Sequence, residues 1–255
     1  MRVAIVGKGG VGKTTVSATL TRALADAGRS VYSIDADPNN CLAYALGFPP
    51  EVADDIKPLS DMTELLSERS GAEPGQGGMH VLNPECADII EDHAISRNGI
   101  KLLVMGTIEK GGGGCACPEG NVLRAVVRDL VDLPDDLVMD MEAGLEHLGR
   151  GTVRHVDGLI AVVAPHVSSA RTVQRIKALA DDIGLKRMVV IANRVKSPED
   201  RAKIEKNLGA DIPVVAELGA YDGLESDYTH DNEAGQQILA DLARQLPAIE
   251  QSLAN

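Results

Sequence analysis

Short runs of apolar residues recur along the chain, separated by longer segments in which apolar residues return with helical spacing. Apolar runs of this length are typical of parallel strands that are covered on both faces of a sheet. They are also too short to cross a membrane. We therefore expect strands at residues 3–6, 31–34, 102–105, 137–141, 159–163, 189–192 and 214–216.

The segments between most of these runs have the periodicity of amphipathic helices. Helices are expected at residues 15–27, 121–131, 169–182, 198–207 and 233–246. The alternation of strand and helix indicates an α/β fold: a three-layer, doubly wound, mainly parallel sheet with helices on both faces. We expect it to form a single domain over residues 1–255. Sheets of this kind bind ligands beyond the carboxyl ends of their strands.

The composition argues against several classes of partner. The 255 residues carry a formal net charge of −13, which disfavours binding to nucleic acid or to an anionic membrane. One Phe, four Tyr and no Trp are too few for a platform that stacks nucleic-acid bases. Residues 236–255, interrupted by Pro247, lack the basic face of a membrane-targeting helix, so we expect a helix that packs on the fold. Because no signal segment is recognisable, we expect a cytoplasmic protein.

The first apolar run leads into Gly-Lys-Gly-Gly-Val-Gly-Lys-Thr-Thr at residues 7–15, which contains the full phosphate-loop pattern. Backbone N–H groups can surround an anion where no Cβ atom intrudes and where unusual φ values are allowed. We therefore expect the backbone of Gly9, Gly10, Val11 and Gly12 to bind phosphate groups. The amino terminus of the following helix adds to this attraction.

Three side chains after the loop complete the expected nucleotide site. Lys13 can reach the β- and γ-phosphates as a point charge, and the hydroxyl of Thr14 can bind Mg²⁺. Thr15 is placed for the α-phosphate. The sequence thus predicts an ATPase with the P-loop NTPase fold, which binds ATP or ADP together with Mg²⁺.

The second lysine of the loop, Lys8, points to a subclass of these enzymes. The whole motif resembles the deviant Walker A motif of the MinD/ParA and nitrogenase iron protein ATPases. The resemblance implies that Lys8 is catalytic and reaches across a homodimer to the partner's phosphates, as an arginine finger does. Without the resemblance, Lys8 would be a solvated loop lysine.

Two carboxylates follow the second expected strand. Asp35 and Asp37, before Pro38, can orient a Mg²⁺ shell and an attacking water. The family resemblance implies that Asp37 positions or activates the water and that Asp35 supports the Mg²⁺ region. A helix cap or a turn before proline is the alternative for Asp37.

Two later strand ends carry further candidates. Asp140 fits the Walker B role, which holds Mg²⁺ through water, and Gly144 fits the switch II glycine that senses the γ-phosphate. The sequence assigns no role to Glu142 or His147. By resemblance Asn193 contacts adenine, since an amide offers both the donor and the acceptor that the base edge requires. A plain turn residue is the alternative.

Cys115 and Cys117 lie in the glycine-rich segment 111–118. On a loop, two thiolates can converge on one ion, but a closed tetrahedral site needs four ligands. A twofold dimer with this loop on its axis would supply four. Thiolates suit Ni²⁺, Zn²⁺, Cu⁺ or an iron–sulfur cluster. The alternatives are two unremarkable thiols in a flexible loop or a reversible redox pair. The isolated Cys41 and Cys86 are expected to be structural.

Together these motifs, in this order, resemble the CooC family of maturation ATPases for nickel-dependent carbon monoxide dehydrogenase. The resemblance implies a homodimer that binds Ni²⁺, or Zn²⁺, and delivers nickel to apo carbon monoxide dehydrogenase or to acetyl-CoA synthase. Only six scattered histidines are present, so a nickel-storage tract is not expected. An iron–sulfur reductase like nitrogenase iron protein and a MinD/ParA-type regulator are the alternatives.

Overall fold

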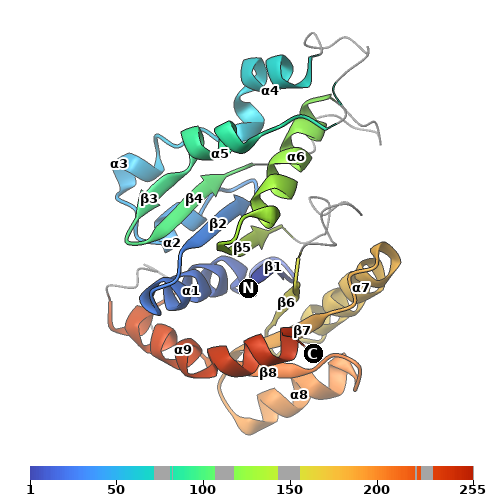
Figure 1. Cartoon of the computed structure of the whole chain (residues 1–255). Helices are drawn as coiled ribbons and strands as arrows, with labels where there is room; N and C mark the ends of the chain where they lie inside the picture. The colour runs from blue at the N-terminus through green and yellow to red at the C-terminus, as the bar shows by residue number, and fades with distance from the viewer. Residues whose placement is uncertain are drawn as a thin grey trace.

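The computed structural model describes residues 1–71, 81, 83–106, 118–142, 156–221, 223–224 and 232–254. In this part of the chain, eight strands form one sheet in the order β3-β4-β2-β5-β1-β6-β7-β8 (Figure 1). All neighbouring strands are parallel except the β3–β4 pair at one edge, which is antiparallel. The strands are β1 (Arg2–Val6), β2 (Val31–Ala36), β3 (Ile95–Arg97), β4 (Ile100–Val104), β5 (Asp136–Met141), β6 (Gly158–Val163), β7 (Met188–Val195) and β8 (Val214–Gly219).

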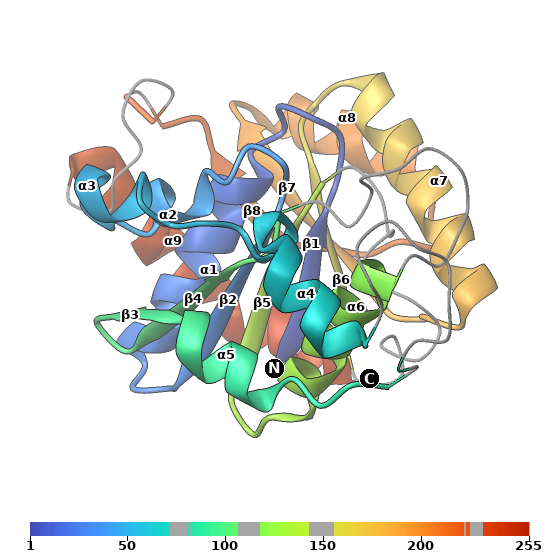
Figure 2. The same cartoon turned by 90° about the horizontal axis from the view of Figure 1, so that it is seen from above.

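Helices cover both faces of this sheet, which confirms the predicted three-layer α/β fold. Figure 2 shows α1 and α9 on one side of the sheet and α6 and α7 on the other. The helices are α1 (Lys13–Asp26), α2 (Leu42–Ala45), α3 (Pro50–Ala53), α4 (Thr63–Ser70), α5 (Ala87–His93), α6 (Pro118–Asp132), α7 (Val167–Ile183), α8 (Pro198–Leu208) and α9 (Glu233–Ala254), with a short 3₁₀ turn, η1 (Leu59–Asp61).

The central strands bury both of their faces, as their apolar runs predicted. In β1, Val3 and Ile5 pack with α1 and α9, whereas Ala4 and Val6 face the opposite core with α6 and α7. Successive strand residues point to opposite faces, so one uninterrupted apolar run serves two cores. This arrangement places β1, and the loop that follows it, near the middle of the sheet.

Several elements were not expected from the sequence. Strand β3 has only three residues, none of them buried, so it has no apolar run to reveal it. Helices α2 and α3 have four residues each, too few to show a helical period. All of these elements lie between β2 and α6.

Helix α9 continues through Pro247 to Ala254, beyond the expected end at residue 246. Its buried stripe includes Leu242, Leu246 and Ile249, whereas Pro247 is exposed. The carbonyl that loses its helical partner, on Ala243, is on an exposed residue as well and can bond to water. Packing of the apolar stripe therefore outweighs the local effect of proline.

Within the described residues, none of the helices combines the length and the apolar character that a membrane-spanning segment needs.

Candidate nucleotide-binding site

The phosphate loop connects β1 to α1 at the carboxyl end of β1. Gly10 and Gly12 have left-handed backbone, with φ values of 79° and 93°. A Cβ atom on Gly12 would lie 2.5 Å from Nδ2 of Asn193, and one on Gly7 would lie 2.6 Å from the carbonyl oxygen of Val162. Glycine is therefore required both by conformation and by space.

Gly12 is also the N-cap residue, directly before the start of α1. Within the described residues no side chain caps this helix. The N–H groups of the first helical turn point toward the loop, and together with the helix dipole they attract a phosphate. Lys13, the first helical residue, is only 8% exposed. Its position fits the predicted contact with the β- and γ-phosphates.

Asp35 and Asp140 lie directly opposite each other on neighbouring strands β2 and β5. They are 0% and 1% exposed. Burial raises the pKa of Asp35 to about 7, although the N–H groups of Leu42 and Asp37 stabilise its charged form. Burial also raises the pKa of Asp140 to about 6, opposed by hydroxyl hydrogen bonds and by nearby Lys13. Each Asp lies one residue before the end of its strand, and the sequence gave no indication of these pKa shifts.

The oxygens of Asp140 indicate how a Mg²⁺ ion would fit. Oδ1 accepts a hydrogen bond of 3.0 Å from the hydroxyl of Ser17, and the Thr14 hydroxyl also donates to this carboxylate. Oδ2 is buried and has no hydrogen-bond partner among the described residues. A hydroxyl beside a free carboxylate oxygen is the donor set that Mg²⁺ uses next to phosphates. Thr14 and Asp140 therefore fit the predicted ion, and Ser17 is a supporting residue that the sequence analysis missed.

Asp37 is half-buried and belongs to the turn that follows β2. Its Oδ1 accepts hydrogen bonds from the backbone N–H of Asn39, at 2.9 Å, and from the Asn39 side chain, at 2.8 Å. The turn role that the sequence allowed is thus present. Asp37 also lies close enough to Asp140 for its negative charge to disfavour the charged form of Asp140. Its catalytic role stays a prediction.

Asn193 connects the end of β7 to the phosphate loop. It is 5% exposed, and its Nδ2 donates a 2.8 Å hydrogen bond to the carbonyl oxygen of Val11, 182 positions away in the chain. Its Oδ1 accepts from the N–H of Arg194 at 3.0 Å. The amide still has one N–H and one lone pair beyond these bonds. Asn193 therefore links β7 to the phosphate loop, and its predicted adenine contact stays a prediction.

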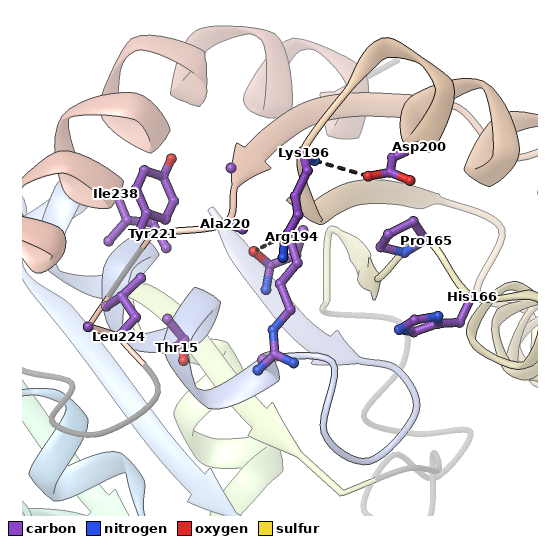
Figure 3. A pocket seen from close by; sticks show the side chains of 14 residues that line it. Thr15, Pro165, His166, Arg194, Lys196, Asp200, Ala220, Tyr221, Leu224 and Ile238 are labelled. Atoms are coloured by element: carbon purple, nitrogen blue, oxygen red, sulfur yellow. Dashed lines mark hydrogen bonds between the residues drawn. The ribbon is translucent and has the colours of Figure 1, made fainter.

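A cavity of about 600 Å³ opens beside the loop, a size typical of small-ligand pockets. Gly12 and Thr15 line its phosphate end. Figure 3 shows its other walls, formed by residues at or just after the ends of β6, β7 and β8 and by residues of α8 and α9. Its lining residues include His166, Asn193, Arg194, Lys196, Tyr221, Leu224 and Ile238. The cavity therefore lies beyond the carboxyl ends of parallel strands, as expected for this type of sheet.

Lys8 is exposed at the rim of the loop. Its Nζ donates a 2.9 Å hydrogen bond to the hydroxyl of Ser168, in the first turn of α7. Lys8 is thus held by its own chain in this structure. Its predicted action on a partner's phosphates stays a prediction.

Several predicted site residues cannot be placed. Cys115, Cys117 and Gly144 lie outside the described residues.

Cys86 is fully buried in the core, where burial raises its pKa to about 11. Cys41 is exposed, and its thiol donates to the carbonyl oxygen of Asn39 at 3.3 Å. The part of the chain that the structure describes holds no cluster of three or more His, Cys, Asp or Glu residues suited to a metal ion.

The comparisons with known proteins agree with this site. A model of the CobQ/CobB/MinD/ParA nucleotide binding domain matches residues 3–229. The chain is 45% identical over 201 residues to the carbon monoxide dehydrogenase accessory protein CooC of Rhodospirillum rubrum, which covers 78% of this chain and 76% of that protein. It is 42% identical over 217 residues to an uncharacterised ATP-binding protein of Methanocaldococcus jannaschii, covering 83% of each.

Solved structures show the same fold. The MinD cell division protein of Aquifex aeolicus superposes with a TM-score of 0.64 at 24% identity, over 97% of both chains. A putative plasmid partition protein of Borrelia burgdorferi, solved with AMPPNP bound, gives a TM-score of 0.69 at 14% identity, over 98% of both chains. The chain therefore belongs to the CobQ/CobB/MinD/ParA family of nucleotide-binding proteins, in the MinD/ParA group together with the CooC accessory protein, and it is an ATPase.

Proposed function

We propose that this ATPase is a maturation factor that binds nickel and inserts it into carbon monoxide dehydrogenase or acetyl-CoA synthase. The observation that carries the proposal is the 45% identity to the CooC accessory protein over 201 residues. That protein's name gives the class of client enzyme. The Cys115–Cys117 pair supports nickel as the cargo, because thiolates are soft ligands that favour late transition metals over Mg²⁺ or Ca²⁺.

In this proposal one chain supplies most of the nucleotide site. Lys13 and the N–H groups at the start of α1 bind the phosphates. Thr14 and Asp140 hold Mg²⁺, which neutralises charge on the phosphate oxygens. Asp37 orients the attacking water beside the γ-phosphate. Gly144 senses whether that phosphate is present.

The second chain of a homodimer supplies Lys8. In the single chain, Nζ of Lys8 is bonded to the hydroxyl of Ser168, which is exposed. A bond between exposed groups is weak and exchanges readily with other partners. Lys8 can therefore leave Ser168 when a partner's triphosphate arrives, and its charge then stabilises the transition state.

The same closure brings the cysteine pairs of two chains together. Each Cys115–Cys117 pair gives two thiolates, so the dimer gives the four ligands that a closed site needs. Hydrolysis opens the dimer and lowers its affinity for nickel, which then passes to the client. This is a coupling between two sites, so nickel must in turn favour nucleotide binding.

Equilibrium dialysis against nickel, with and without a non-hydrolysable ATP analogue, tests this proposal. We expect about one Ni²⁺ per two wild-type chains, and none for the Cys115→Ala/Cys117→Ala variant, which keeps its ADP affinity. Cys41→Ala is the matched control, because it removes an exposed thiol outside the predicted metal site and should leave nickel binding unchanged.

Unchanged nickel stoichiometry in the double variant would contradict the proposal. Iron content and visible absorption after anaerobic purification would instead favour the iron–sulfur reductase.

A further inference from the structure

We propose that Tyr221 forms the wall of the pocket that contacts the face of the nucleotide base, and that Asp241 holds its ring in place. The inference rests on the nucleotide-binding part of the proposed function and is independent of nickel. It assigns a role to a residue that the sequence motifs do not mark.

The pocket has two unlike sides. In Figure 3, Tyr221, Leu224 and Ile238 gather on one side of Arg194, whereas Pro165 and His166 lie on the other. Ile238 is 1% exposed, and Tyr221 and Leu224 pack against the same apolar cluster. A base has apolar faces and a polar edge, so this apolar side matches it better than the side of His166.

The phosphate end of the pocket fixes the direction in which a nucleotide must run. The triphosphate is drawn to Gly12 and the start of α1, and Thr15 is the residue expected at the α-phosphate. Thr15 lies on the same side of Arg194 as Tyr221 (Figure 3). A nucleotide that continues beyond its α-phosphate past Thr15 therefore places its base toward Tyr221.

The ring of Tyr221 is held in one orientation at the wall of the pocket. Its hydroxyl donates a 2.6 Å hydrogen bond to Oδ2 of Asp241 on α9. Burial raises the pKa of this hydroxyl, so it stays a neutral donor. The ring is half-buried between the core and the pocket. A ring that is already ordered loses little entropy when a ligand packs on it.

The scarcity of aromatic residues makes this position informative. The chain has one Phe, four Tyr and no Trp, and one of these five rings lines the nucleotide pocket. Its neighbours in the cluster are mostly aliphatic, so filling the core does not require a ring with a hydroxyl here. A tyrosine ring can stack on a flat π-system, which an aliphatic side chain cannot do.

Isothermal titration with Mg²⁺ compares two ligands: ADP, which has a base, and inorganic tripolyphosphate, which does not. We expect Tyr221→Ala to weaken ADP binding about tenfold while changing tripolyphosphate binding by less than about twofold. Tyr221→Phe keeps the ring and should lose less than about threefold for ADP. Tyr221→Leu preserves most of the packing volume, so it separates loss of the ring from loss of the fold, and it should resemble Tyr221→Ala.

His166→Ala is the comparison variant for the opposite side of the pocket. The inference is overturned if Tyr221→Ala and Tyr221→Leu bind ADP like the wild type. Equal weakening of tripolyphosphate would also overturn it, since that result indicates a structural role. A base-dependent loss in His166→Ala alone would place the base on the other side. Wild-type protein that binds neither ligand would contradict the nucleotide function itself, which is a different outcome.

Discussion

The two ends of the nucleotide pocket are built in different ways. At the phosphate end, the consecutive residues 7–15 supply backbone N–H groups, a lysine and hydroxyls at the start of α1. At the other end, the walls come from the ends of β6, β7 and β8, from the residues just after them, and from α8 and α9. In the proposed binding mode, phosphate binding depends on local backbone geometry, whereas contact with the base depends on how distant elements pack. The phosphate end can be predicted from the sequence, whereas the other end can be identified only in the folded structure.

Replacing Lys13 should have the largest effect, because it removes the charge at the phosphate end. We expect Lys13→Ala to lower kcat/KM for ATP about a thousandfold, as loss of a preorganised transition-state contact does. Release of phosphate from ATP at several ATP concentrations measures kcat/KM. Lys101→Ala is the matched control, since Lys101 lies in β4 and pairs with Asp135. Weakening of both ADP and tripolyphosphate by Lys13→Ala would distinguish this end from the Tyr221 end.

Lys8→Ala should slow hydrolysis about a hundredfold while leaving ADP binding to the single chain unchanged, because the predicted contact is made only across the dimer. Ser168→Ala removes the partner that Lys8 has in the single chain and should change hydrolysis by less than about threefold. Normal hydrolysis by Lys8→Ala would show that the transition state does not use this lysine.

The buried carboxylates make the nucleotide-free protein sensitive to pH. The pKa of Asp35 is raised to about 7 in the fold, so folding favours its protonated form, and stability falls as pH rises from about 4 to about 7. Asp35→Asn removes this titration. In EDTA, we expect the unfolding free energy of the wild type, measured with urea, to fall by about 2 kcal/mol relative to that of the variant as pH rises from 5 to 8. A stability difference that is constant with pH would contradict this account of Asp35.

Asn193 is the residue that joins the two ends, so its replacement should affect both. Asn193→Ala removes the amide that bonds to the carbonyl of Val11 and to the N–H of Arg194. We expect a loss of about 1 to 2 kcal/mol in unfolding free energy, measured by urea denaturation. Tripolyphosphate and ADP should both bind more weakly, unlike in Tyr221→Ala. If only ADP weakens, Asn193 acts on the base and does not position the loop.

The sequence predicted those parts of the molecule in which one local signal determines the structure. Apolar runs revealed the central strands, and the phosphate-loop spacing revealed the start of α1. Asp35 and Asp140 were found because each closes an apolar run, and the parallel register then sets them side by side. In each case, the signal that marks the residue lies within a few neighbouring positions.

Features that depend on distant contacts were missed. Nothing near Asn193 indicates that its amide bonds to Val11, and nothing near Tyr221 indicates Asp241. Helix α9 passes through Pro247 because tertiary packing of its apolar stripe outweighs local propensity. Four-residue helices such as α2 are stabilised by packing and leave no periodic pattern.

The most direct test of the account is reconstitution of nickel-free carbon monoxide dehydrogenase with nickel, ATP and this protein. We expect wild-type protein to increase nickel content and dehydrogenase activity in an ATP-dependent manner. Lys13→Ala and the Cys115→Ala/Cys117→Ala variant should each fail. Equal activation by these variants, or by wild-type protein without ATP, would contradict the claim that nucleotide hydrolysis drives nickel delivery.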